Sequence, residues 1–244
     1  MDVMRLVGNI NNGYRYGYDW TYILVLIGAF LCLICSAFVK STFNKYSKSR
    51  VSSGVTGKEV AEAILRENGL YDVKVEPIKG SLTDNYNPGR KVLSLSESVY
   101  SSNSISAVSV AAHECGHAIQ HSEEYFPLIA RSKLHPLANF GSKYGLWIVI
   151  LGLIISFLRP LTTIGIILFF FGTLFEIVTL PVEFDASRRA LSIISDMGVV
   201  NSSELPLAKK VLRSAAMTYV ASAAAAILSL IRLILLSKGG KRRD

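Results

Sequence analysis

Long apolar runs alternate with polar segments along this chain of 244 residues. A membrane-spanning helix needs about 20 apolar residues, with a lower limit near 17. Four runs approach or pass that length: Tyr22–Val39, Tyr144–Leu158, Leu161–Leu180 and Ala215–Leu236. The pattern therefore predicts a mainly α-helical membrane protein with three to four transmembrane helices.

The second and fourth runs leave alternatives open. The second run is short, and Arg159 with Pro160 is predicted to form a tight turn that joins it to the third run as a helical hairpin. The fourth run is rich in alanine and serine and carries Arg232. It is predicted to span the bilayer, to pack inside the bundle or to lie partly at the interface.

Composition supports the membrane class and argues against others. Half of the residues are hydrophobic and the mean hydropathy is +0.38, which is too apolar for an ordinary soluble domain of this size. The three cysteines cannot organise a disulfide scaffold. Cys32 and Cys35 are predicted to be small helix residues inside the first apolar run. Positive residues cluster at the ends of the apolar runs, and this distribution argues against a nucleic-acid partner.

The net charge of +8 also predicts sidedness. Basic residues flank the apolar runs in the segments Lys40–Lys143 and Pro181–Ser214. By the positive-inside rule, both segments are expected on the cytoplasmic side of a bacterial plasma membrane. The basic tail Lys238–Arg243 fits this arrangement poorly if the fourth run also crosses.

The segment between the first two apolar runs has the pattern of a small α+β unit. The tetrad Thr56–Glu59 is a capping box, and its helix is predicted to run to about Asn68. Val73–Pro77 and Lys91–Leu95 are predicted to be short strands. Asp84–Gly89 between them has the composition of a turn.

An H-E-x-x-H motif lies at the end of this unit. His113 and His117 are one helical turn apart, so both imidazoles can reach one zinc ion. A bound zinc lowers the pKa of water from about 16 towards about 7, and the Glu114 carboxylate can take a proton from that water. Cys115 is predicted to point away into the core. Gly116 indicates close approach of a neighbouring backbone or tight helix packing.

Catalytic zinc has three protein ligands in most enzymes, so a third residue is required. His121 continues the helical series but lies two turns from the first histidine, and His135 precedes a proline, which disfavours helix there. Glu183 and Asp185 follow the third apolar run. Glu183 is the preferred ligand because it opens the run directly after the apolar segment, and on a helix Asp185 faces elsewhere. Ser187 shares the helical face of Glu183 and is a candidate to support the site by hydrogen bonding.

These motifs carry a resemblance to a known family. Ala111–Gln120 and Leu180–Ser187, together with Leu82–Tyr86 and Leu95–Tyr100, resemble the YugP-type membrane zinc metallopeptidases. A more distant similarity is to HtpX-type proteases and prenyl-protein endopeptidases, in which the glutamate lies in an E-F-x-A-D run. Here Ser187 stands where that run has its aspartate.

The resemblance implies a zincin-like (gluzincin-type) catalytic unit with one Zn²⁺ per chain. In such peptidases a strand edge before the active-site helix holds the substrate as an added β-strand. The candidate edge is Lys91, Val92, Leu93, Ser94 and Leu95, with an ordinary internal strand as the alternative.

The expected organisation of the chain follows from these assignments. It comprises an N-terminal tail (1–21), a first transmembrane helix (22–39), the zincin-like domain (40–143), a transmembrane hairpin (144–180), a segment with the third ligand (181–214), a transmembrane or interfacial helix (215–236) and a basic tail (237–244).

Glu176 is an acid inside the third apolar run. Such groups face a bundle interior or an aqueous cavity. It precedes Glu183 by seven residues and so lies on nearly the same helical face. It is therefore expected to line a water-filled approach to the metal or to pair with a polar group.

The predicted function is an integral-membrane zinc endopeptidase acting on membrane-associated or unfolded polypeptides, with the lipid bilayer as its other partner. Glu114 would be the general base and then the proton donor to the leaving amine. The sequence assigns no second oxyanion donor, and Arg188 and Tyr219 could be named only by guesswork. The alternatives are a zinc-binding scaffold or sensor without turnover, and a small transporter built around Glu176. No oligomeric state is predicted.

Overall fold

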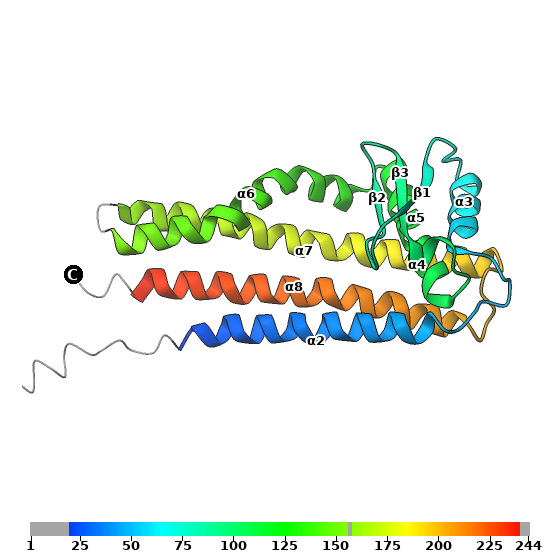
Figure 1. Cartoon of the computed structure of the whole chain (residues 1–244). Helices are drawn as coiled ribbons and strands as arrows, with labels where there is room; N and C mark the ends of the chain where they lie inside the picture. The colour runs from blue at the N-terminus through cyan, green and yellow to red at the C-terminus, as the bar shows by residue number, and fades with distance from the viewer. Residues whose placement is uncertain (1–19, 156–157, 240–244) are drawn as a thin grey trace, which may run out of the picture.

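In the computed structural model, which describes residues 20–155 and 158–239, long helices form a bundle with a small sheet-bearing unit at one end (Figure 1). The bundle helices are α2 (Tyr22–Tyr46), α6 (Phe126–Ile154), α7 (Arg159–Asp196) and α8 (Leu205–Gly239). All four are long and apolar enough to cross a membrane. The described chain is therefore mainly helical, as predicted, with four candidate spans.

Helix α2 exposes many apolar side chains on the outside of the bundle. Only 6% of its most apolar window is buried, and many of its large apolar side chains between Tyr22 and Phe38 are exposed, whereas Phe43 and Tyr46 near its end are buried. Exposed apolar residues on α2 are Tyr22, Ile23, Leu26, Ile27, Phe30, Leu31, Leu33, Ile34 and Phe38. Such a surface matches a hydrocarbon environment.

Small residues set the spacing between the bundle helices. A Cβ added to Gly141 of α6 would lie 2.1 Å from the carbonyl oxygen of Leu168 in α7. A Cβ added to Gly28 of α2 would lie 2.9 Å from the Cα of Ala225 in α8. Close backbone approach at small residues is the common packing mode of helices in lipid.

Prolines interrupt these helices less than the sequence indicates. Helix α6 continues through Pro136, although helix was predicted to be disfavoured there, and it is visibly bent (Figure 1). Arg159 and Pro160 form the first turn of α7 and not the predicted hairpin turn, because a proline at a helix start loses no hydrogen bond. Helix α7 also continues through Pro181. The connection before it includes residues 156–157, which lie outside the described part.

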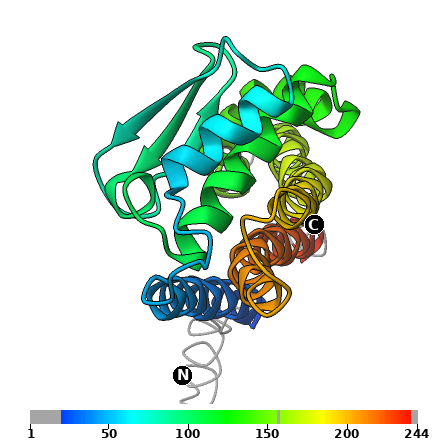
Figure 2. The ribbon, with the colours of Figure 1, turned by 90° about the vertical axis from the view of Figure 1, so that its right-hand side faces the viewer.

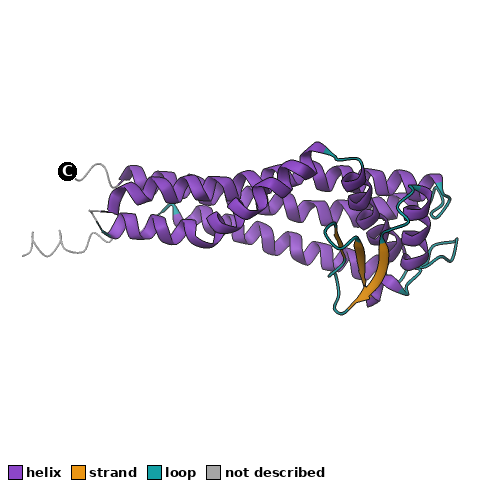
Figure 3. Ribbon diagram, turned by 90° about the horizontal axis from the view of Figure 1, so that it is seen from above, coloured by secondary structure: helices purple, strands orange, loops and turns teal. Residues whose placement is uncertain are grey.

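The compact unit contains α3 (Gly57–Glu67), α4 (Glu97–Tyr100), α5 (Ile105–Ser122) and three short strands. The predicted capping box is confirmed: the Glu59 carboxylate accepts from the Thr56 backbone N–H at 2.8 Å, and the Thr56 hydroxyl oxygen accepts from the Glu59 N–H at 3.3 Å. The strands gather at one end of the helical bundle (Figure 3).

The sheet order corrects the prediction of a free strand edge at Lys91–Leu95. The strands are β1 (Lys74–Ile78), β2 (Asn85–Asn87) and β3 (Val92–Ser96), in the order β1-β3-β2. Strand β3 is central, parallel to β1 and antiparallel to β2. Its backbone groups are occupied on both sides, and β2 occupies the segment predicted to be only a turn.

The core joins this unit to the membrane helices. Helix α5 lies between the sheet and α7 (Figure 2). Leu93 and Leu95 of β3 share one buried cluster with Ala190 and Ile194 of α7 and with Leu212 of α8. Parts of α7 and α8 thus pack in the core of the compact unit as well as in the bundle, so the bundle helices fix the position of this unit.

Both ends of the described chain, Trp20 and Gly239, lie at the end of the bundle away from the sheet (Figure 1). The expected boundaries at 39/40, 143/144, 180/181 and 214/215 all fall inside continuous helices. Most of the expected N-terminal tail and of the basic tail lies outside the described residues.

Candidate functional site

Helix α5 carries the H-E-x-x-H motif in regular helical geometry. It begins after Ser104, whose hydroxyl oxygen accepts a hydrogen bond from the Ala107 N–H at 3.2 Å. His113 and His117 project from one face of this helix, and their ring centroids are 4.7 Å apart. Cys115 faces the other way, is fully buried and contacts the Ala61 carbonyl oxygen at 3.7 Å. It is a core residue, as the sequence predicted.

A glycine brings α5 against α7 at the site. A Cβ added to Gly116 would lie 2.7 Å from the carbonyl oxygen of Ala186 and 3.1 Å from its Cα. Only a glycine permits this backbone approach without displacement. The contact places α7 where Glu183 can reach the two histidines.

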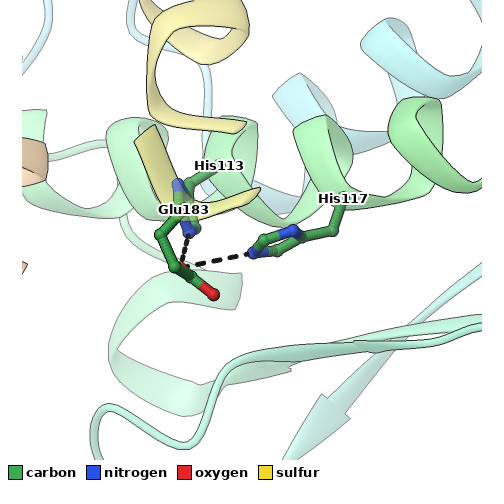
Figure 4. Close-up of side chains that lie close together, drawn as sticks. All are labelled: His113, His117 and Glu183. Atoms are coloured by element: carbon green, nitrogen blue, oxygen red, sulfur yellow. Dashed lines mark ion pairs between the residues drawn. The ribbon is translucent and has the colours of Figure 1, made fainter. Parts of the chain in front are cut away.

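The Glu183 carboxylate lies between the two imidazoles (Figure 4). Its Oε2 is 3.3 Å from Nε2 of His113 and 3.7 Å from Nε2 of His117. The three potential donor atoms lie within 4.8 Å of one another. Oε2 is buried and has no hydrogen-bond partner, so a carboxylate oxygen and two ring nitrogens converge without satisfying one another. This donor set fits a zinc ion.

The outward-facing nitrogen of each imidazole has its own partner. Nδ1 of His113 is 3.1 Å from the hydroxyl of Ser187, which therefore lies where the sequence analysis expected it. Nδ1 of His117 is 3.1 Å from Oε1 of Gln120. These contacts aim the Nε2 atoms at Glu183, an arrangement that orients metal-binding histidines in proteins.

Gln120 was not recognised from the sequence. Its amide nitrogen donates to the Val182 carbonyl oxygen and to the Asp185 carboxylate, both at 2.9 Å. Because two acceptors fix the amide nitrogen, Oε1 must face His117 and accept from its Nδ1–H. Asp185 is held in turn by the Arg189 Nε–H at 2.6 Å. The i, i+3 spacing of His117 and Gln120 on one helix was the available signal.

Glu114 borders a cavity of about 460 Å³ beside the triad. It is 8% exposed, and burial raises the pKa of its carboxyl above the ordinary value. The cavity lies between β2, α5, α6, α7 and α8. Its walls include Asp84, Asn85, Tyr86, Pro88, His117, His121, Leu128, Arg131, Ser132, His135, Phe175, Glu183 and Tyr219.

Three walls of this cavity bear on its chemistry. The Tyr86 hydroxyl of β2 is 3.1 Å from Nδ1 of His121. An Arg131 guanidinium nitrogen is 3.7 Å from Oε1 of Glu183. Tyr219 of α8 reaches the same space. The cavity therefore combines three carboxylates, three histidines, one cation and two phenols.

Several sequence candidates lie elsewhere. His121, His135 and Asp185 are outside the three-residue cluster. The side chain of Arg188 is 78% exposed and pairs with Asp185, so it does not face the cavity. None of the residues Lys91–Leu95 lines the cavity. Glu176 lines a second cavity, of about 340 Å³.

The Gly116 contact gives a direct test of how the site is assembled. Gly116→Ala is expected to destabilise the protein by about 1–3 kcal/mol, because the new methyl overlaps the backbone of α7. A lower melting temperature in thermal unfolding of the detergent-solubilised protein would show this. Gly172→Ala, at a helical glycine whose nearest neighbour atom would be 3.8 Å away, is the matched control and should melt like the wild type. Equal melting of both variants would contradict the close crossing.

Comparisons with known proteins identify the family of the chain. The chain matches a family model described as "Putative neutral zinc metallopeptidase" over residues 21–238. It is 48% identical over 203 residues to "Putative membrane protease YugP" of Bacillus subtilis (strain 168), which covers 83% of this chain and 90% of that protein. No solved structure matches the chain. The family and the relative support a protease role, and the chain belongs to this family of neutral zinc metallopeptidases.

Proposed function

We propose that this chain is an integral-membrane zinc-dependent endopeptidase with a zincin-like catalytic unit. The observation that carries the proposal is the convergence of His113, His117 and the unpartnered Oε2 of Glu183 beside the buried Glu114 carboxylate. The family to which the chain belongs supports it.

One zinc ion per chain would be held by Nε2 of His113, Nε2 of His117 and the Glu183 carboxylate. When bound, zinc polarises the scissile carbonyl and lowers the pKa of water, so that hydroxide is available near neutral pH. Ser187 and Gln120 orient the two imidazoles through their Nδ1 atoms. Their hydrogen bonds keep the lone pair of each Nε2 directed at the metal position.

Glu114 is proposed as the general base and then the general acid. From the cavity wall it takes a proton from the attacking water and delivers it to the departing amine nitrogen. Burial raises its pKa, which makes the carboxylate a stronger base and the protonated acid easier to retain until the amine leaves.

The outer edge of β2 is proposed to hold the substrate backbone, in place of Lys91–Leu95. Within the described residues β2 pairs only with β3, and its Asn85 and Tyr86 line the cavity together with Glu114. An extended peptide added to this edge would pass the triad. Tyr219 is proposed as the oxyanion donor, because it lines this cavity whereas Arg188 does not.

The setting proposed for this activity is a bacterial plasma membrane with the site on the cytoplasmic side. The basic segments Lys40–Lys143 and Pro181–Ser214 meet at the end of the bundle that carries the sheet (Figure 1). Membrane-associated or unfolded proteins are the substrates that can reach a site at this level.

The proposal is tested by incubating the purified protein, in lipid nanodiscs, with unfolded and membrane-inserted polypeptides and identifying the products by mass spectrometry. Internal cleavage that a chelator abolishes is expected. A protein that binds zinc but cleaves nothing would instead be a zinc-binding scaffold.

The hydrogen bond from His117 to Gln120 yields a further prediction. Gln120→Met keeps the side-chain volume but removes the acceptor, and it is expected to weaken zinc binding by about 10- to 100-fold. The affinity is measured by competition with a chromogenic chelator. Ser122→Ala, which removes a hydroxyl that only donates to the Ile119 carbonyl oxygen, is the control and should bind zinc normally. Equal affinities for the two variants would show that Gln120 does not orient the ligand.

A further inference from the structure

A second cavity lies between α6, α7 and α8 and contains polar groups. Its volume is about 340 Å³. The lining residues are His135, Ala138, Asn139, Ser142, Phe169, Gly172, Thr173, Phe175, Glu176 and Ala226. All lie on helices that qualify as membrane spans. Burying polar groups between apolar helices costs free energy unless a polar partner or occupant forms interactions with them.

This cavity adjoins the proposed active site. His135 and Phe175 line both spaces. The Phe175 ring meets the His135 ring edge to face, with centroids 5.8 Å apart, and the Arg131 guanidinium lies 5.7 Å from its centroid. Phe175 and His135 therefore form the boundary between the two cavities, and the second cavity adjoins the cleft in which a polypeptide would lie.

Several hydrogen-bond acceptors line the second cavity. The Ser142 hydroxyl donates to the Asn139 carbonyl oxygen at 3.2 Å, and the Thr173 hydroxyl donates to the Phe169 carbonyl oxygen at 3.2 Å. Their protons are thus engaged, while their oxygen lone pairs remain able to accept. The Glu176 carboxylate makes no hydrogen bond or ion pair with any described residue, and the positive charge that acts on it is that of Arg131, which itself lies 3.7 Å from Glu183. An occupant with N–H donors and a positive charge would meet these oxygen acceptors and the Glu176 carboxylate.

The position of Glu176 sets a distance to the proposed zinc ligand. It precedes Glu183 by seven residues on the continuous helix α7, which is a rise of about 10 Å. An extended polypeptide covers about 3.3 Å per residue, so it spans this distance in about three residues.

We propose that the second cavity binds a lysine or arginine side chain of a membrane-inserted substrate segment, about three residues from the cleaved bond, with Glu176 as its counter-ion. The inference rests on the proposed peptidase function and adds a substrate class to it. In the low-dielectric bundle, the carboxylate and the incoming cation compensate one another, and a neutral side chain does not supply this compensation.

The test uses two synthetic membrane-inserted peptides that differ only in carrying lysine or norleucine three residues from the cleavage site, on its membrane side. Wild-type protein in nanodiscs is expected to cleave the lysine peptide with a kcat/KM about tenfold higher, equivalent to about 1.4 kcal/mol. Glu176→Gln should cleave both peptides at similar rates. Glu97→Gln, an exchange on the short helix α4, is the control and should keep the preference. Equal cleavage of both peptides by the wild type would overturn the inference and leave the peptidase function standing.

A binding measurement separates the two proposals further. Fluorescent versions of both peptides are titrated onto Glu114→Gln protein and onto the Glu114→Gln, Glu176→Gln double variant. If the single variant binds the lysine peptide more tightly and the double variant does not, the cavity assignment is supported, even if wild type shows no cleavage. Indistinguishable binding of the two peptides by the single variant would overturn it.

Discussion

Replacing Glu114 with glutamine is expected to lower the kcat/KM for peptide cleavage by about 100- to 10,000-fold, the usual contribution of a general acid–base group. The amide retains the size and most of the packing of the carboxyl but cannot accept a proton from water. Because Glu114 is not among the three converging donors, the variant should still bind one zinc ion per chain.

The measurement pairs cleavage kinetics with zinc content on the same preparation. Glu97→Gln carries the same chemical change away from the cavity and should retain both properties. Unaltered cleavage by the Glu114 variant would contradict its assigned role. Loss of zinc would show instead that Glu114 supports the metal.

The second large effect is expected at Glu183. Glu183→Gln should weaken zinc binding by more than about 100-fold, since a charged ligand is replaced by a neutral amide and even groups that only support ligands contribute 10- to 100-fold. The fold should persist, because the Gln120–Asp185 hydrogen bond and the Gly116 crossing remain.

Zinc affinity by chelator competition, together with circular dichroism, measures these two properties. The comparison with Glu114→Gln is informative because both residues are buried acids in one cavity, yet only Glu183 is predicted to be essential for the metal. Wild-type affinity in the Glu183 variant would exclude it as a ligand. A folded variant without zinc, together with a zinc-loaded but inactive Glu114 variant, would separate binding from catalysis.

Features that depend on local spacing were predictable from the sequence. The turn-to-turn distance of His113 and His117 requires only helical geometry, and the capping box at Thr56 is a local pattern. The helical face shared by Glu183 and Ser187 is local as well, and the structure places both at the histidines. The apolar runs likewise indicate helices whatever the surroundings.

Features that depend on tertiary packing could not be predicted from the sequence. For Lys91–Leu95 the sequence left an edge strand and an internal strand open, and the structure shows the internal one. The order of strands depends on which segment pairs with β3, and the three residues of β2 are too few to recognise. Helix through Pro136 persists because packing against α7 outweighs one missing backbone donor. The role of Gln120 depends on α7, which places Asp185 and the Val182 carbonyl oxygen within hydrogen-bond distance of its amide nitrogen.

The positions of residues in the cavities also depend on tertiary packing. Glu176 could be recognised as an unusual acid in an apolar run, but its place in a separate cavity, beyond Phe175, required the relative positions of α6, α7 and α8. Tyr219 could be named as a candidate donor from its type alone. Its position beside Glu114 depends on α8 passing along the full bundle.

The central claim is that zinc held by this triad cleaves peptide bonds. The most direct test is the rate of cleavage of an unfolded polypeptide by the purified wild-type protein in nanodiscs, before chelation, after removal of the metal and after addition of one equivalent of zinc. Cleavage is expected to be lost on chelation and to return when one equivalent of zinc is added. Cleavage that continues unchanged in the metal-free protein would contradict the central claim.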